Sequence, residues 1–104
     1  MQLFTIESIP GKNIEAIGIV KGTTVHSKNI VKDFMAGMKT LVGGELSGYT
    51  DMLIEARQIA TKRMVDEAEA MGADAVINIR YGSSQIMSSA AEVIAYGTAV
   101  KIKE

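Results

Sequence analysis

One long stretch, from residue 50 to residue 71, has apolar side chains that recur every three or four residues, which is the spacing of one face of an α-helix. Thr50 can cap its start, and Gly72 is a natural stop beyond its end. The alanines in this stripe are small, so the helix can lie close to a sheet. The stripe consists of Leu53, Ala56, Ala60, Met64, Ala68 and Met71. This stretch predicts a helix packed on a sheet that the rest of the chain must supply.

Strand patterns occupy four other segments, namely residues 2–8, 14–25, 74–81 and 92–103. In the second and fourth, apolar residues occur at both odd and even positions, which is typical of strands covered on both faces. Alternation predicts three sets that each share one side of a strand: Ile14, Ala16, Gly18 and Val20; Ala75, Ile77, Ile79 and Tyr81; and Ile94, Tyr96, Val100 and Ile102. The small residues Val93, Ala95, Gly97 and Ala99 form an opposite face that could receive a helix or another subunit.

A further helix is predicted over residues 29–41, where Asn29 can act as N-cap. The pair Gly43–Gly44 falls between the two helices. A nest of glycine amides can bind an anion, but the Lys-Ser/Thr pair of a P-loop and the third glycine of a dinucleotide fingerprint are missing. We therefore favour a helix-to-helix joint.

Residues 82–90, "GSSQIMSSA", are polar and small and predict a loop.

These elements predict a single α+β domain over residues 1–104, in the order β-β-α-α-β-β, with two helices and a small, mainly antiparallel sheet. Two helices do not obviously cover both faces and all edges of such a sheet. Pairing with other copies of the chain would solve that problem. We therefore expect a homo-oligomer.

Composition excludes several classes of function. The 104 residues carry a net charge of −1 without a basic block, and five aromatic residues include no tryptophan, so nucleic-acid binding is not expected. The absence of cysteine excludes disulfides, thiolate metal sites and a cysteine nucleophile. No apolar run approaches the roughly 20 residues that cross a bilayer, and the N-terminus lacks the pattern of a signal peptide. We expect a soluble cytoplasmic protein.

Two sets of residues are candidates for binding. His26 is the single histidine and could ligate a metal only if several copies met on a symmetry axis; the alternative is an exposed or turn histidine. Glu45, Tyr49, Arg57 and Arg80 could line an anion pocket at a subunit interface, or they could be surface and subunit-contact ion pairs. The seven methionines are better explained as core filling than as soft-metal ligands.

Residues from about 15 to 102 resemble the YbjQ-like family, a family of unknown function that carries a heavy-metal-binding label. The resemblance is carried by Val42-Gly43-Gly44-Glu45, Tyr49, Ala56-Arg57, Gly72-Ala73-Asp74-Ala75-Val76 and Gly97-Thr98-Ala99-Val100. It implies a dodecin-like subunit that assembles into a closed ring, typically a pentamer. This chain differs from its relatives in having Glu45-Leu46 after the double glycine where they often have Arg-Ser.

Three functions are therefore considered. The first is a non-enzymatic, homo-oligomeric binding or scaffold protein, expected as a pentamer whose partner is itself. The second is a protein that binds a divalent heavy-metal ion through His26 and carboxylates at subunit interfaces. The third is an enzyme with an interfacial active site, for which the sequence offers no acid–base pair with a telling spacing.

Overall fold

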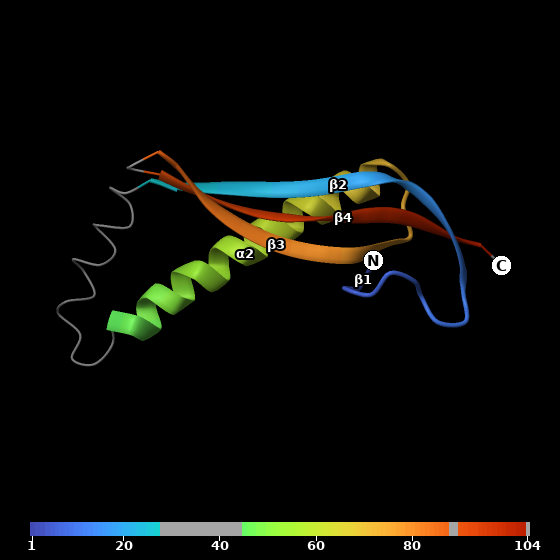
Figure 1. Ribbon diagram of the computed structural model, residues 1–104, viewed down its shortest axis with the longest axis horizontal. Helices are drawn as coiled ribbons and strands as arrows, with labels where there is room; N and C mark the ends of the chain where they lie inside the picture. The colour runs from blue at the N-terminus through green and yellow to red at the C-terminus, as the bar shows by residue number, and fades with distance from the viewer. Residues whose placement is uncertain (28–44, 88–89, 104) are drawn as a thin grey trace.

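The computed structural model describes residues 1–27, 45–87 and 90–103. These residues form helix α2 and one four-stranded sheet with the strand order β1-β3-β4-β2. Helix α2 crosses one face of the sheet diagonally, and the N-terminal segment runs beside the start of β3, at the end of the molecule where α2 finishes (Figure 1). The elements are β1 (Gln2–Leu3), β2 (Asn13–Ser27), α2 (Glu45–Ala70), β3 (Ala75–Met87) and β4 (Ala90–Lys103).

The fold is α+β, but the predicted arrangement of a two-helix, dodecin-like β-β-α-α-β-β subunit is wrong. The described residues contain one helix, in the order β-β-α-β-β, and the sheet is mixed because β1 runs parallel to β3. Local alternation does not encode the direction of a partner strand, so this parallel pair could not be seen in the sequence. The helix predicted over residues 29–41 and the joint at Gly43–Gly44 lie outside the described residues.

The apolar stripe of α2 is confirmed as its packing face from Ala56 to Ala68, whereas Leu53 is half-buried and Met71, just beyond the helix, is 37% exposed. Ala56, Ala60, Met64 and Ala68 are completely buried, and they form one cluster with residues of β2, β3 and β4. Gly22 of β2 lies directly under this face and allows the helix backbone to approach the strand closely. The small-residue face of β4 therefore receives a helix; the sequence had left open whether a helix or another subunit would pack there. Within the described part of the chain, no helix is both long and apolar enough to cross a membrane.

The described sheet has three register shifts, one of them between Gln85 and Met87 of β3. The other two are β-bulges that change which of the predicted residues share a face. The register of β2 shifts between Ala16 and Gly18, and that of β3 shifts between Ile77 and Arg80, both beside the regular strand β4. The β3 bulge contains Asn78, whose φ of 54° is left-handed. Predicted faces in these two strands are therefore wrong beyond the bulge, because each extra residue inverts the alternation. Ile77 packs in a second cluster, whereas Ile79 joins the cluster under α2.

The second cluster lies on the sheet face opposite α2 and is covered by the N-terminal segment. Ile9 packs there against Ala75, Ile77 and Val100. Backbone hydrogen bonds hold this segment to β3, among them one of 2.9 Å from the Phe4 amide to the carbonyl of Val76. The segment predicted as a strand over residues 2–8 is strand only at Gln2–Leu3, because it then bends to cover this cluster.

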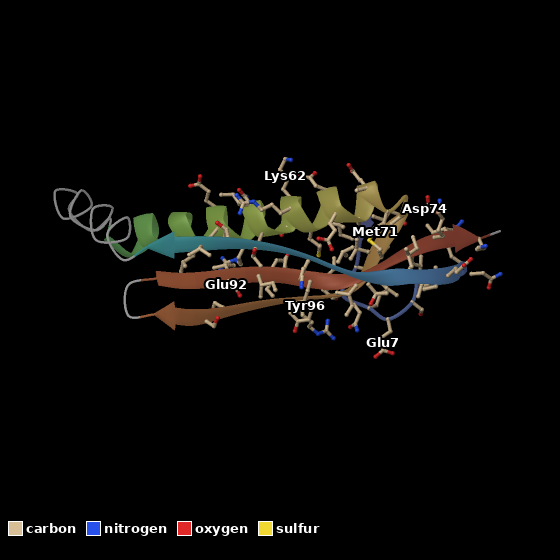
Figure 2. All side chains as sticks on the ribbon, turned by 90° about the horizontal axis from the view of Figure 1, so that it is seen from above. Glu7, Lys62, Met71, Asp74, Glu92 and Tyr96 are labelled. Carbon is tan, nitrogen blue, oxygen red and sulfur yellow. The ribbon has the colours of Figure 1, made fainter. Side chains whose placement is uncertain are left out.

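Much of the same face remains exposed, and we call this part the open face; it comprises Ile19 and Val25 of β2 and Tyr96 of β4. Their exposed fractions are 74%, 52% and 43%. Strand register places them on the side away from α2, and Figure 2 shows Tyr96 there while Lys62 points outward from the helix.

Residues 82–87, predicted as part of a loop, continue β3 as strand. Gly82 pairs with Ile94, and Ser83 pairs with Val93. Small polar residues have weak strand preference, but the long partner strand β4 offers hydrogen bonds along this whole length, and tertiary context overrides local preference. The prediction of a loop there was wrong for these residues, and residues 88–89 are not described.

Candidate functional site

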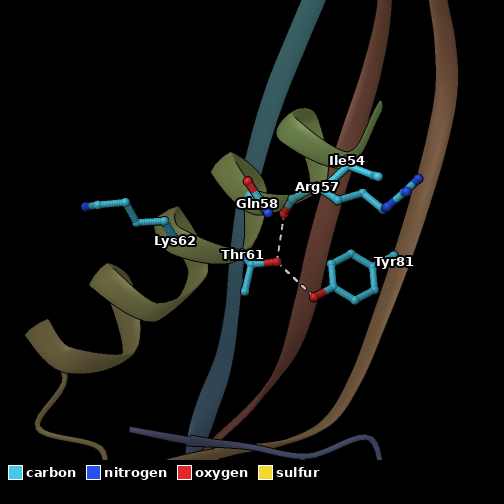
Figure 3. A pocket seen from close by; sticks show the side chains of 6 residues that line it. All are labelled: Ile54, Arg57, Gln58, Thr61, Lys62 and Tyr81. Atoms are coloured by element: carbon cyan, nitrogen blue, oxygen red, sulfur yellow. Dashed lines mark hydrogen bonds between the residues drawn. The ribbon is translucent and has the colours of Figure 1, made fainter. Parts of the chain in front are cut away.

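A groove opens beside α2 because the helix does not cover the whole sheet. The helix packs on β2 and β4, so the helix-side surface of β3 is left beside it. The lining side chains of α2 are Ile54, Arg57, Gln58, Thr61 and Lys62, whose spacing of three and four residues places them on one side of the helix. Tyr81 of β3 forms the opposite wall, and the groove holds about 580 Å³ (Figure 3).

A smaller hollow of about 360 Å³ adjoins the groove. Both share Arg57 and Tyr81, and the smaller one is completed by Leu53, Gly82, Ser83 and Val93. The two volumes together reach the range of small-molecule sites, roughly 300–1,000 Å³. The lining combines apolar and polar side chains, as ligand pockets do. The aliphatic and aromatic ones are Leu53, Ile54, Tyr81 and Val93, and the polar ones are Arg57, Gln58, Thr61, Lys62 and Ser83.

Hydrogen bonds fix the orientation of the polar groups between the two walls. The Thr61 hydroxyl donates to the carbonyl oxygen of Arg57 at 2.7 Å, and its Oγ1 lies 2.8 Å from the Tyr81 Oη. A threonine hydroxyl has one proton, so Thr61 must accept from Tyr81 in the second bond. Both hydroxyl protons are therefore used within the chain. The Tyr81 oxygen presents only lone pairs to a ligand in the groove.

Charge in the groove is positive. Among the residues that the structure describes, its lining contains Arg57 and Lys62 but no carboxylate and no histidine. Lys62 is engaged with Asp66 at 3.0 Å, an exposed pair that contributes little to stability. Arg57 belongs to neither ion pair found among the described residues. In Figure 3 its guanidinium extends from α2 toward β3, over the groove.

The predicted set of Glu45, Tyr49, Arg57 and Arg80 is brought together only in part. Arg57 lines the groove. Arg80 is paired with Tyr96 on the opposite side of the sheet, where it donates to the carbonyls of Thr5 at 3.2 Å and Ile79 at 2.9 Å. Arg80 thus holds the N-terminal segment and does not face the groove.

The remaining candidates are placed by their backbone alone. Glu45 begins α2, and Tyr49 lies in its second turn. His26 lies near the end of β2 and pairs with Ala91 of β4. The side chains of these three candidates lie outside the described set. Sequence reasoning missed Thr61 and Tyr81, although the helical spacing of Ile54, Gln58 and Thr61 with Arg57 could have indicated a shared side of the helix.

With this geometry established, comparison with known proteins assigns the family. A sequence model of the YbjQ family, described as "Putative heavy-metal-binding", matches residues 1–103. The chain belongs to the YbjQ family. The resemblance seen in the motifs from Val42 to Val100 is thereby confirmed.

Relatives and a solved structure agree with this assignment. A UPF0145 protein of Clostridium novyi is 64% identical over 102 residues, covering 98% of this chain and 99% of its own. A UPF0145 protein of Pseudothermotoga lettingae is 59% identical over 105 residues, covering 100% and 99%. A crystal structure of a protein of unknown function from Pediococcus pentosaceus, of the DUF74 family, is 18% identical with a TM-score of 0.68, covering 99% of this chain and 98% of its own. That last likeness concerns the fold alone.

The heavy-metal label of the YbjQ family finds no matching donor set in the described part of this chain. No group of three or more His, Asp or Glu side chains there is close enough to hold an ion. The whole sequence has no cysteine and one histidine, so the soft ligands that select heavy metals are scarce. Any site would have to combine groups from several copies or from residues beyond the described ranges.

Proposed function

We propose that this chain is a non-enzymatic binding protein that works as a homo-oligomer, with the groove beside α2 as its ligand site. The observation that carries the proposal is the open face, where Ile19 is 74% exposed in a chain of otherwise ordinary composition. Apolar surface concentrated on one sheet face is typical of a contact with another protein. The resemblance to the YbjQ-like family favours a pentamer.

Two strand edges support assembly. In the described sheet β2 has a partner on one side only, and β3 beyond Arg80 has β4 alone. Long open edges promote pairing with other chains unless they are protected. One protective contact exists, since Arg63 of α2 donates to the carbonyl of Thr23 in β2 at 2.6 Å. A second copy would satisfy the remaining edge groups and cover the open face at the same time.

A non-enzymatic role is supported by the groove chemistry. The lining residues within the described ranges include neither a carboxylate nor a histidine, the side chains that most often serve as general acid or base. Arg57 presents a planar guanidinium whose fork of N–H donors is suited to holding an anion.

Light scattering coupled to size-exclusion chromatography tests the assembly. We expect a mass about five times the 11.1 kDa of one chain. Ile19→Lys should shift this mass toward the monomer, because a buried interface does not tolerate an unpaired charge. Met71→Lys is the matched control, an exposed apolar residue just after α2. A monomer for the unmodified chain at micromolar concentration contradicts the proposal.

Heavy-metal binding is the second candidate, and the description of the family model is the observation that favours it. In this proposal His26 and carboxylates of neighbouring copies would bind a divalent ion together. Titration with zinc, copper and nickel, followed by calorimetry, tests it. Binding tighter than about 0.1 mM that His26→Ala abolishes supports this function, and binding that ignores His26→Ala refutes this assignment of the site.

A further inference from the structure

We propose that the groove beside α2 binds a small amphiphilic monocarboxylate, with the carboxylate on Arg57 and the apolar body along Ile54, Leu53 and Tyr81. This inference deepens the binding role proposed above and rests on it. It concerns an organic ligand, whereas the description of the family model names heavy metals and the relatives' names give no ligand.

The charge of the groove selects an anion. Arg57 and Lys62 contribute positive charge, and the described part of the lining has no carboxylate to offset it. Lys62 is already engaged with Asp66, so Arg57 supplies the main binding charge. A guanidinium presents parallel N–H donors whose spacing matches the two oxygens of a carboxylate. One such group balances one negative charge, which favours a monoanion.

The hydrogen bonds of the opposite wall select against further polarity in the ligand. Tyr81 donates its proton to Thr61, and Thr61 donates its own proton to the Arg57 carbonyl. Neither hydroxyl has a proton left for an anionic ligand. The Tyr81 oxygen would repel a carboxylate placed against it. The anionic group must therefore lie at the Arg57 end, while the ring of Tyr81 faces the apolar body.

The size and lining of the groove suit the apolar body. Its volume of about 580 Å³ continues past Arg57 into the second hollow, which adds Val93 and Leu53. A straight chain of about eight carbons fits within such a volume, and burying its methylenes contributes roughly 0.8 kcal/mol each at best. A guanidinium at Arg57 with the apolar side chains of Leu53, Ile54 and Val93 on either side of it favours an amphiphile over a small hydrophilic acid.

Octanoate is the probe, with octanol and acetate as matched partial ligands. Shifts of backbone amide NMR signals on the deuterated full-length protein locate the site. We expect octanoate to shift signals of residues 54–62 and 81–83 with a dissociation constant of the order of 1 mM, as expected for about ten heavy atoms. Octanol and acetate should each bind at least about fivefold more weakly, because each lacks one half of the interaction.

Two variants separate charge from shape. Arg57→Gln should weaken the binding of octanoate about tenfold. Lys101→Gln removes a cation of β4 that lies outside the groove, and it should leave octanoate binding unchanged. Tyr81→Phe should bind octanoate at least as well as the unmodified chain, because its oxygen offers no proton. Octanoate shifts confined to the open face, equal binding of octanol, or loss of binding in Tyr81→Phe would each overturn the proposal.

The experiment distinguishes failure of the ligand assignment from failure of the proposed homo-oligomer. Mass by light scattering is measured on the same samples. An oligomer without octanoate shifts in the groove refutes the ligand assignment alone, whereas a monomer that binds octanoate in the groove refutes the assembly and leaves the ligand assignment standing. The comparison of octanoate with octanol needs no variant, so it decides the question even if Arg57→Gln does not fold.

Discussion

Replacing Gly22 with alanine gives the sharpest test of how α2 lies on the sheet. A Cβ added at Gly22 would lie 2.1 Å from the carbonyl oxygen of Ala60 and 2.3 Å from the amide nitrogen of Met64. Ordinary contact begins at 3.4 Å. Both neighbouring atoms belong to the helix backbone and cannot rotate away. The helix would therefore have to retreat from β2 by about 1 Å or more, opening gaps in a close-packed core.

The expected effect is a loss of at least about 2 kcal/mol in the free energy of unfolding. Overpacking of this kind is destabilising by about 1–3 kcal/mol or more, and the reduced entropy of the unfolded chain returns only about 0.4–1 kcal/mol. For a domain of this size, the melting temperature should fall by about 8 °C or more. Urea denaturation followed by circular dichroism measures the change, at equal protein concentrations because assembly would shift stability by mass action.

Gly18→Ala is the matched control in the same strand and on the same face. A Cβ there would meet only the terminal methyl of Met71, at 3.4 Å. That methyl ends a flexible side chain, so Gly18→Ala should be neutral or stabilising by up to about 1 kcal/mol. Equal stabilities of the two variants, or a Gly22→Ala protein within about 0.5 kcal/mol of the parent, would show that the helix is not seated on Gly22.

Three further outcomes follow from the structure. Met64→Ala should lower stability by about 2–5 kcal/mol in urea denaturation, because the Met64 side chain of α2 is completely buried between the helix and the sheet. Tyr81→Phe should lower stability by about 1 kcal/mol, through loss of the bond to Thr61, with little change in far-ultraviolet circular dichroism. The hydrogen bond from Lys103, followed by the Lys103 charge, holds the pKa of Glu15 below its ordinary 4.5. The same hydrogen bond, followed by the Glu15 charge, raises the pKa of Lys103 above 10.5. The contribution of this pair to stability is fully present above pH 4.5 and is lost as pH falls through the lowered pKa of Glu15. At the basic end, the contribution is fully present below pH 10.5 and is lost as pH rises through the raised pKa of Lys103. Lys103→Gln should raise the Glu15 pKa in an NMR titration, and an unchanged value would contradict the pairing.

The sequence was informative wherever one periodic pattern sufficed. The stripe from Ala56 to Ala68 predicted the buried face of α2, because spacing along a helix depends only on its regular geometry. The small face of β4 was predicted equally well, since β4 has no bulge between its pairings with β2 and β3 that would invert its own alternation. The family, too, was correctly inferred from motifs spread along most of the chain.

The groove was only half predictable. Arg57 was a candidate from the sequence, but it was grouped with Arg80, which the strand register places on the other side of the sheet. Tyr81 was assigned to the same side as Ile77, and the bulge at Asn78 moved it to the helix side, where it meets Thr61. A bulge is a property of two paired strands, so one strand's sequence carries little sign of it.

What the sequence determined by itself is the existence of a long helix that packs through small residues, a set of strands with apolar residues on both faces, and the family. These depend on the order of side chains along regular elements. Tertiary structure alone decided that β1 runs parallel to β3, that two bulges invert the faces of β2 and β3, and that α2 covers β3 as far as Ile79 but leaves a groove beside Tyr81. These features arise from contacts between segments far apart in the chain, and they are what places Arg57 and Tyr81 across one groove.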